Sequence, residues 1–216
     1  VLKWIRKYIE LMSQYVEQFQ PQVGGIWHSD EMTLNVRRTE PTGKGNYDWL
    51  WNLMDHETRF LLASQVTKHR DVQDAQKVFR KAKETTNGQM PDFVVTDKLH
   101  SYNDAFNKEF FTLRNPRTKH VKLKNIREGT TNNIVERLHG TVRDRVKVMR
   151  GLDNDVSAQK VVDGHRFYYN FLRPHQTLNG KTPAEKASID LKLEGNKWKE
   201  LIIRAKRNPK VIKGEK

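Results

Sequence analysis

The 216-residue sequence contains no cysteine and no long apolar segment. The lack of cysteine excludes disulfides and thiolate metal sites, and it suits a reducing compartment. No apolar run approaches the roughly 18 residues of a membrane-spanning helix, and no signal peptide is visible. We therefore expect a cytoplasmic protein that does not interact with membranes.

Acidic residues are few relative to basic ones. Forty Lys and Arg residues stand against 26 Asp and Glu residues, which gives a formal net charge of +14. Such an excess favours a polyanionic partner, most often nucleic acid. A merely basic surface produces the same composition, so the charge alone says nothing about catalysis.

The first twenty residues follow a helical pattern, which ends at the proline and glycines of residues 20–25. We predict that residues 1–22 are a connecting helix and linker whose upstream neighbour is missing. Residues 23–190 form the predicted core. Residues 191–216 are rich in lysine and are predicted to be a basic C-terminal tail.

Residues 23–190 contain short alternating segments followed by longer helical ones. The predicted strands are 26–38, 47–54, 60–67, 93–96 and 120–123, with a turn at 39–46. The predicted helices are 71–86, 101–108, 131–150 and 157–172. This order resembles that of a ribonuclease-H-like α/β fold, a mixed five-stranded sheet flanked by helices.

Three acids occupy three different predicted elements. Asp30 lies within the first strand, Asp97 directly follows the strand 93–96, and Glu136 lies in a helix. Carboxylates gathered from separate elements favour a hard divalent cation. Structural alternatives exist, because an Asp after a strand often caps a turn and acids are common on solvated helix faces.

The choice between Asp30 and its neighbour Glu31 is not decided by spacing. Successive side chains of a strand point to opposite faces, so we expect only one of the two to join the site. A carboxylate in the middle of a strand is costly to bury unless it is paired or bound to a metal.

The predicted helix 131–150 has an apolar face and an adjacent charged face. Its expected core residues are Val135, Leu138, Val142, Val146 and Met149, and its polar face holds Glu136, His139, Gly140, Arg143, Lys147 and Arg150. A row of charged residues along a helix is more often simply a face exposed to solvent. However, a basic row that continues for three turns past the acid suits an extended polyanion.

Four segments resemble the DDE transposases of prokaryotic insertion sequences, and more narrowly the insertion-sequence-six family, which is related to retroviral integrase cores. They are Trp27-His28-Ser29-Asp30-Glu31, Val94-Val95-Thr96-Asp97, Asn133-Ile134-Val135-Glu136-Arg137-Leu138-His139 and Tyr169-Asn170-Phe171-Leu172-Arg173-Pro174-His175. The resemblance covers about residues 1–190. The 38 residues between Asp97 and Glu136 slightly exceed the usual spacing, which implies a longer loop within residues 109–127.

The resemblance implies an enzyme that cleaves DNA at the 3′ ends of an insertion sequence and joins them to target DNA. Two Mg²⁺ ions, with Mn²⁺ as a substitute, would be held by Asp30, Asp97 and Glu136. It also implies a homodimer or larger assembly on the terminal repeats and target DNA of the nucleoid. An end-reading DNA-binding domain would precede residue 1.

The implied DNA-binding residues are those of the polar helix face, namely His139, Arg143, Lys147 and Arg150. Two alternatives remain open. One is a transposase-derived DNA-binding protein without catalysis, and the other is a ribonuclease-H-like nuclease that only hydrolyses. A Mg²⁺-dependent strand-transfer assay separates all three.

Overall fold

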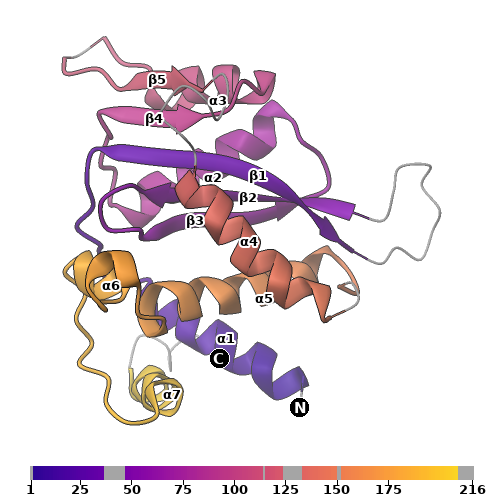
Figure 1. Ribbon diagram of the computed structural model, residues 1–216, viewed down its shortest axis with the longest axis vertical. Helices are drawn as coiled ribbons and strands as arrows, with labels where there is room; N and C mark the ends of the chain where they lie inside the picture. Colours follow the sequence, from indigo (N-terminus) through magenta and orange to yellow (C-terminus); the bar gives the residue numbers. More distant parts are fainter. Residues whose placement is uncertain (1, 37–46, 114, 124–132, 150–151, 209–216) are drawn as a thin grey trace.

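The structure of the protein, a computed structural model, describes residues 2–36, 47–113, 115–123, 133–149 and 152–208 (Figure 1). In chain order its elements are α1 (Leu2–Val16), β1 (Ile26–Asn35), β2 (Tyr47–Asp55), β3 (Leu61–Thr67), α2 (Val72–Thr85), β4 (Phe93–Thr96), α3 (His100–Phe110), β5 (Lys119–Lys122), α4 (Asn133–Lys147), α5 (Asp155–Phe167), η2 (Tyr168–Leu172), η3 (Gln176–Leu178), α6 (Pro183–Lys186) and α7 (Lys197–Arg207). The predicted turn at 39–46 and part of the predicted loop within 109–127 lie outside the described residues.

The five strands form one mixed sheet in the order β3-β2-β1-β4-β5. The first three strands are antiparallel neighbours, whereas β4 runs parallel to β1 and β5 runs parallel to β4. The crossover from β3 to β4 contains α2, as a parallel connection requires. This is the ribonuclease-H-like α/β topology that the sequence predicts.

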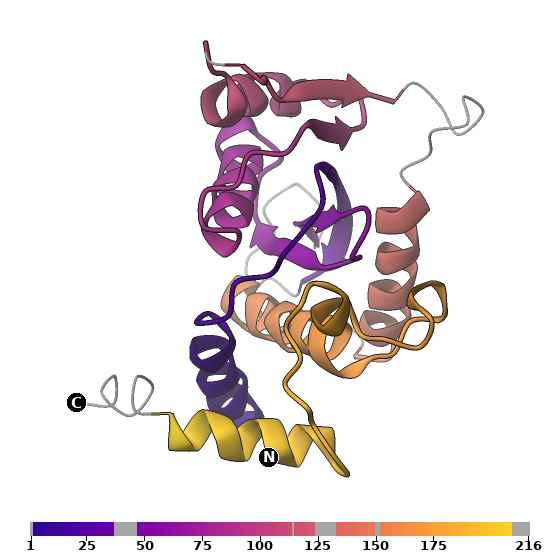
Figure 2. The same cartoon turned by 90° about the vertical axis from the view of Figure 1, so that its left-hand side faces the viewer.

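Helices cover both faces of the sheet, with α2 and α3 on one face and α4 and α5 on the other (Figure 2). Because side chains alternate along β1, Trp27 joins the core cluster of the α2–α3 face while Met32 and Leu34 join that of the α4 face. Burial on both faces explains why these strands carry apolar residues at successive positions.

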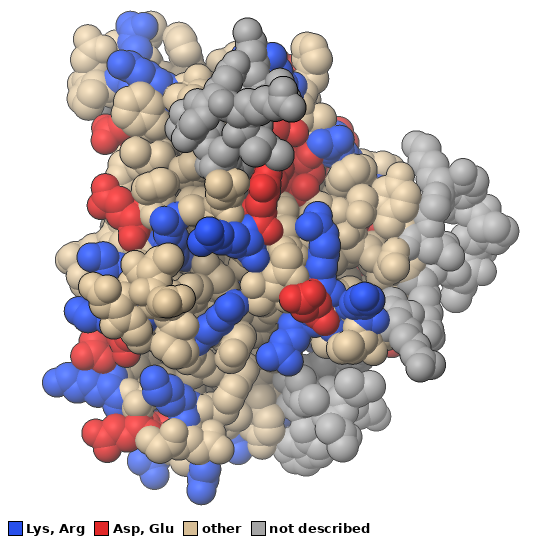
Figure 3. All heavy atoms as spheres, viewed as in Figure 1, with Lys and Arg blue, Asp and Glu red and all other residues tan. Residues whose placement is uncertain are grey.

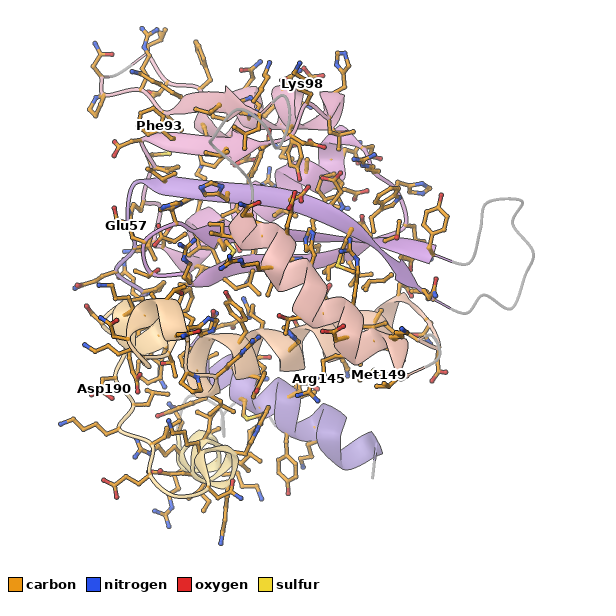
Figure 4. The ribbon with its side chains drawn as sticks, in the orientation of Figure 1. Glu57, Phe93, Lys98, Arg145, Met149 and Asp190 are labelled. Atoms are coloured by element: carbon orange, nitrogen blue, oxygen red, sulfur yellow. The ribbon has the colours of Figure 1, made fainter. Side chains whose placement is uncertain are left out.

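Helix α4 lies on the sheet through the apolar stripe that its spacing predicts. Its buried residues are Val135, Leu138, His139, Val142 and Val146. The prediction that Met149 belongs to this stripe is wrong, since α4 ends at Lys147 and Met149 is 45 % exposed. Met149 lies just beyond the end of the helix, near Arg145 (Figure 4).

The outer edge of β3 is closed by two amide side chains from the helical layer. Asn170 accepts a hydrogen bond from Leu61 N (2.8 Å) and donates one to Leu61 O (3.0 Å). Gln159 likewise accepts from Val66 N (2.8 Å) and donates to Ser64 O (3.1 Å). An unpaired strand edge invites pairing with another chain, and these amides occupy its backbone groups.

The two ends of the described chain pack together beside α5. Met12 of α1 belongs to the same core cluster as Leu201 and Ala205 of α7. The segment predicted as a basic tail therefore contains a helix with a buried side, which its lysine content did not indicate. None of the described helices has both the length and the apolarity needed to cross a membrane.

Candidate active site

The site lies at an open edge of β1, next to the end of β4. Within the described sheet, β4 pairs with β1 only from Ile26 to His28. Farther along β1, the edge that β4 leaves free carries Asp30 and Glu31, and Asp97 directly follows β4. Carboxylate oxygens of these three acids all lie within 4.8 Å of one another.

Asp30 and Glu31 reach this site from opposite faces of β1. Asp30 faces α4, where its Oδ2 lies 3.7 Å from His139 Nδ1. Glu31 faces α3, where the Tyr102 hydroxyl donates to its Oε2 over 2.7 Å. Oxygens of both acids nevertheless reach the same group, because the described pairing of β4 with β1 ends at His28, so strand alternation alone does not decide which of them joins the site.

The two acids differ in how many partners they already have. The Glu31 side chain is only 1 % exposed and is bound by both Tyr102 and Arg70. Asp30 Oδ1 accepts only the backbone N–H of Glu31, over 3.0 Å, among the hydrogen bonds between described residues. Asp30 therefore keeps more capacity to coordinate an added cation.

The Asp97 carboxylate stabilises the turn after β4 and also belongs to the group of acids at the site. Its Oδ1 accepts the backbone N–H of Leu99 over 2.8 Å, so the capping alternative is correct for one oxygen. Its Oδ2 lies 3.8 Å from Arg70 Nη2, and 43 % of the side chain is exposed. The Asp97 side chain is therefore accessible from solvent.

Glu136 lies in the first turn of α4 and is exposed. Among the described residues, the group of acids within 4.8 Å of one another does not include it. It is nevertheless close enough for its charge to raise the pKa of Asp30. The structure thus places Glu136 near the other three acids but outside the group whose oxygens lie within 4.8 Å of one another.

Negative charge accumulates here in a partly desolvated position. Burial, together with the smaller effects of the charges of Glu31, Asp97 and Glu136, raises the pKa of Asp30 to about 7. Burial also raises the pKa of Glu31, against the opposing effects of Tyr102 and Arg70. A bound cation would relieve this repulsion, and carboxylate oxygens are the ligands that Mg²⁺ prefers.

His139 is placed differently from the expectation that it lies on the exposed face of α4. Its side chain is 3 % exposed and borders Asp30. Burial, with a smaller effect of Arg143, lowers the pKa of His139 to about 4, so the ring is neutral at pH 7. Arg143 and Lys147 are exposed, as predicted, and Arg150 lies outside the described residues.

A family model matches most of the chain. The family model described as a DDE domain, that of IS240-type transposases, matches residues 25–175, well over half of the chain. The chain belongs to the DDE transposase family. The matched segment contains all three predicted acids of this transposase. No curated protein sequence matches the transposase significantly.

Two solved structures are similar to the transposase at 15 % sequence identity. The catalytic core domain of BIV integrase aligns over 76 % of this chain and 94 % of its own, with a TM-score of 0.47. The simian T-cell lymphotropic virus intasome, solved in complex with PP2A regulatory subunit B56 gamma, aligns over 78 % of this chain and 56 % of its own, with a TM-score of 0.44. The fold assignment rests on the strand order described above.

Arg70 and Tyr102 are parts of the transposase site that sequence reasoning missed. Arg70 contacts both Glu31 and Asp97 and stacks on Trp49, with its guanidinium carbon 4.6 Å from the ring centroid. Neither residue belongs to a quoted motif, and the helical spacing that places Tyr102 on the buried side of α3 does not indicate the partner of its hydroxyl. In the space-filling view, acidic side chains gather near the middle of this face between basic ones (Figure 3).

Proposed function

We propose that this DDE transposase cleaves DNA at the 3′ ends of an insertion sequence and transfers those ends to target DNA, using Asp30, Asp97 and Glu136. The observation that carries the proposal is the approach of Asp30 and Asp97, remote in sequence, to within 4.8 Å at an open strand edge. Like charges are gathered in this way where a cation is to be bound.

Asp30, Asp97 and Glu136 would hold the divalent ions, and the all-oxygen donor set suits Mg²⁺ or Mn²⁺. When bound, such ions activate the attacking oxygen and stabilise the departing 3′ oxygen. His139 supports this role because its neutral ring adds no positive charge next to Asp30. Arg70 balances the charge of Glu31, the acid that we assign to structure.

The proposed reaction has two displacements at phosphorus. In the first, a water oxygen attacks the scissile phosphodiester, the bond from phosphorus to the 3′ oxygen breaks, and that oxygen takes up a proton. In the second, the resulting 3′ hydroxyl attacks a target phosphodiester and displaces the target 3′ oxygen, which is protonated in turn. No covalent bond to the protein forms at either step.

We assign the DNA contacts to the exposed side of α4. Arg143 and Lys147 are exposed and lie one turn apart on the helix that carries Glu136. The net charge of +14 supports a polyanionic partner. We place this activity on nucleoid DNA in the cytoplasm, in a homodimer or larger assembly, because two element ends must be held together.

The test is strand transfer from a duplex carrying the element's terminal repeat into a target plasmid, with Mg²⁺. We expect Asp97→Asn to lower cleavage and joining at least ~1,000-fold, about 4 kcal/mol of barrier, with DNA affinity unchanged. Asp104→Asn is the matched control, since Asp104 is exposed on α3 outside the site. Activity retained in Asp97→Asn would overturn the assignment.

The same assay distinguishes the two alternative functions. Cleaved ends without joined products would identify a nuclease that only hydrolyses. Retarded DNA that stays uncut with either Mg²⁺ or Mn²⁺ would identify a DNA-binding protein without catalysis.

A further inference from the structure

A second concave site lies on the flank of α4 that does not carry Glu136. The cavity has a volume of about 550 Å³, and its polar lining comes from three parts of the chain: the turn between β2 and β3, the first half of α4, and the segment after η2. These polar lining residues include Arg59, Asn133, Arg137, Thr141, Arg173 and His175. Arg137 and Thr141 share one side of α4 through their spacing of four residues.

Positive charge gathers at this cavity. Its described lining includes Arg59, Arg137 and Arg173 but no Asp or Glu. Arg137 is close enough to affect Arg59, and Arg173 and Arg59 both affect His175. Burial and, to a smaller degree, the charge of Arg137 lower the pKa of Arg59 against the opposing effects of Tyr169 and Asp55, and burial followed by Arg173 and Arg59 lowers that of His175. An anion in the cavity would offset this repulsion.

Two of the lining side chains, Arg173 and His175, are held in place by neighbouring groups. Arg173 Nη1 donates to Thr141 Oγ1 over 3.2 Å, which ties the segment after η2 to α4. The His175 ring packs edge-on against Tyr169, with centroids 4.6 Å apart. Preorganised donors of this kind lose little freedom on binding, which favours a specific ligand over diffuse attraction.

Arg59 provides a further observation. It adopts a left-handed backbone conformation with φ of 60°, and its Nη1 is enclosed without a hydrogen-bond partner in the described structure. A buried N–H without a partner is costly, so such a group calls for an explanation. An anionic oxygen entering the cavity is a suitable acceptor once the Arg59 side chain adjusts.

We infer that this cavity binds a backbone phosphate of DNA, at a site separate from the carboxylates. Guanidinium groups bind phosphate oxygens through paired charge-assisted hydrogen bonds. DNA is the favoured source because the cavity opens beside the helix whose other side we assign to DNA. The inference rests on the proposed function, since it requires a protein that acts on DNA.

The first test is the DNA affinity of Arg137→Glu, measured by fluorescence anisotropy in EDTA so that cleavage does not contribute. Arg137 is exposed, which makes a folding defect avoidable. We expect about tenfold weaker binding and a plot of log affinity against log salt that is shallower by about 1. Arg207→Glu is the control, because it makes the same charge change at an exposed position of α7. Equal losses in both variants would overturn the inference.

The second test locates the phosphate. Neutral methylphosphonates are placed one at a time along the duplex and tested with both the wild-type protein and Arg137→Glu. At one position, the methylphosphonate should weaken DNA binding by the wild-type protein but not by Arg137→Glu. In that variant the arginine that contacts the phosphate is already absent. Additive losses at every position would mean that no backbone phosphate occupies the cavity.

A third test separates DNA from a free anion as the ligand. If inorganic phosphate raises the melting temperature of the wild-type protein but not of Arg137→Glu, and DNA affinity is equal in both, the assignment to DNA fails. The outcomes also distinguish this inference from the proposed function. A wild-type protein that binds no DNA would overturn both proposals. Normal strand transfer by the wild-type protein, with equal losses of DNA affinity in Arg137→Glu and Arg207→Glu, would overturn only the phosphate site.

Discussion

Two adjacent acids of β1 illustrate how far the surroundings decide the chemistry of a residue. Asp30 and Glu31 carry the same functional group and lie at the same strand edge. Glu31 is almost fully enclosed and is bound by Arg70 and Tyr102. Asp30 is 19 % exposed and has a pKa raised to about 7 by burial and neighbouring acids. We therefore regard Asp30 as the ligand and Glu31 as the residue that holds Arg70.

Substitution of each acid by its amide tests this division. Asp30→Asn should lower strand transfer by at least ~1,000-fold. Glu31→Gln should keep activity within about tenfold but lower the free energy of unfolding by roughly 1–3 kcal/mol, because Arg70 loses a buried partner. Strand transfer and urea unfolding measure the two effects. The roles are reversed if Glu31→Gln is inactive at unchanged stability.

At the scale of elements, the segment after α5 joins the helical layer to the sheet. The predicted helix 157–172 is α-helical only as far as Phe167, and Tyr168–Leu172 forms a π-helical turn. Asn170 in this turn binds both backbone groups of Leu61 on the edge strand β3. A residue within the family-like motif thus has a structural role at the strand edge.

Asn170→Leu tests this connection. The leucine leaves a buried N–H and a buried C=O of Leu61 without partners, so we expect a loss of about 2–4 kcal/mol of unfolding free energy. Asn107→Leu, at an exposed position of α3, is the control and should change stability by less than about 0.5 kcal/mol. Urea unfolding of both proteins checks the prediction, which fails if the two losses are equal.

At the scale of the whole molecule, buried histidines link stability to pH. Burial lowers the pKa values of His120, His139 and His165 to about 4. Folding therefore favours the neutral rings, and this contribution is complete above the usual histidine pKa of 6.5 and is lost as pH falls toward 4. Asp30 acts oppositely, since its raised pKa favours folding as pH falls from 7 toward 3.8.

We expect the histidines to prevail, because four lowered histidine pKa values (His120, His139, His165 and His175) act against the raised pKa values of Asp30, Glu31 and Asp163. His165 alone, with its pKa lowered from 6.5 to about 4, corresponds to roughly 3 kcal/mol at about 1.4 kcal/mol per pH unit. Unfolding free energy should therefore fall between about pH 7 and pH 4, and His165→Gln should lose less over this interval. Urea unfolding across the interval measures both slopes. If the unfolding free energy of His165→Gln falls with pH as steeply as that of the wild-type protein, His165 does not contribute to the pH dependence.

The sequence by itself determined the order of strands and helices, the apolar stripe of α4 and the acids Asp30, Asp97 and Glu136 as candidates. These features are readable because periods of 2 and 3.6 residues are local properties of the chain. The same reasoning misplaced His139 and Met149, since helix ends and the borders of a buried stripe depend on the sheet beneath.

Only the tertiary structure decided which groups meet. The early end of β4 opens the edge of β1, so that Glu31 comes within reach of the site and Arg70 bridges Glu31 to Asp97. The arginine cavity joins Arg59, Arg137 and Arg173 from distant parts of the sequence. Such convergence depends on strand pairing and helix packing between distant segments. These contacts produce no regular residue spacing that could be recognised in the sequence.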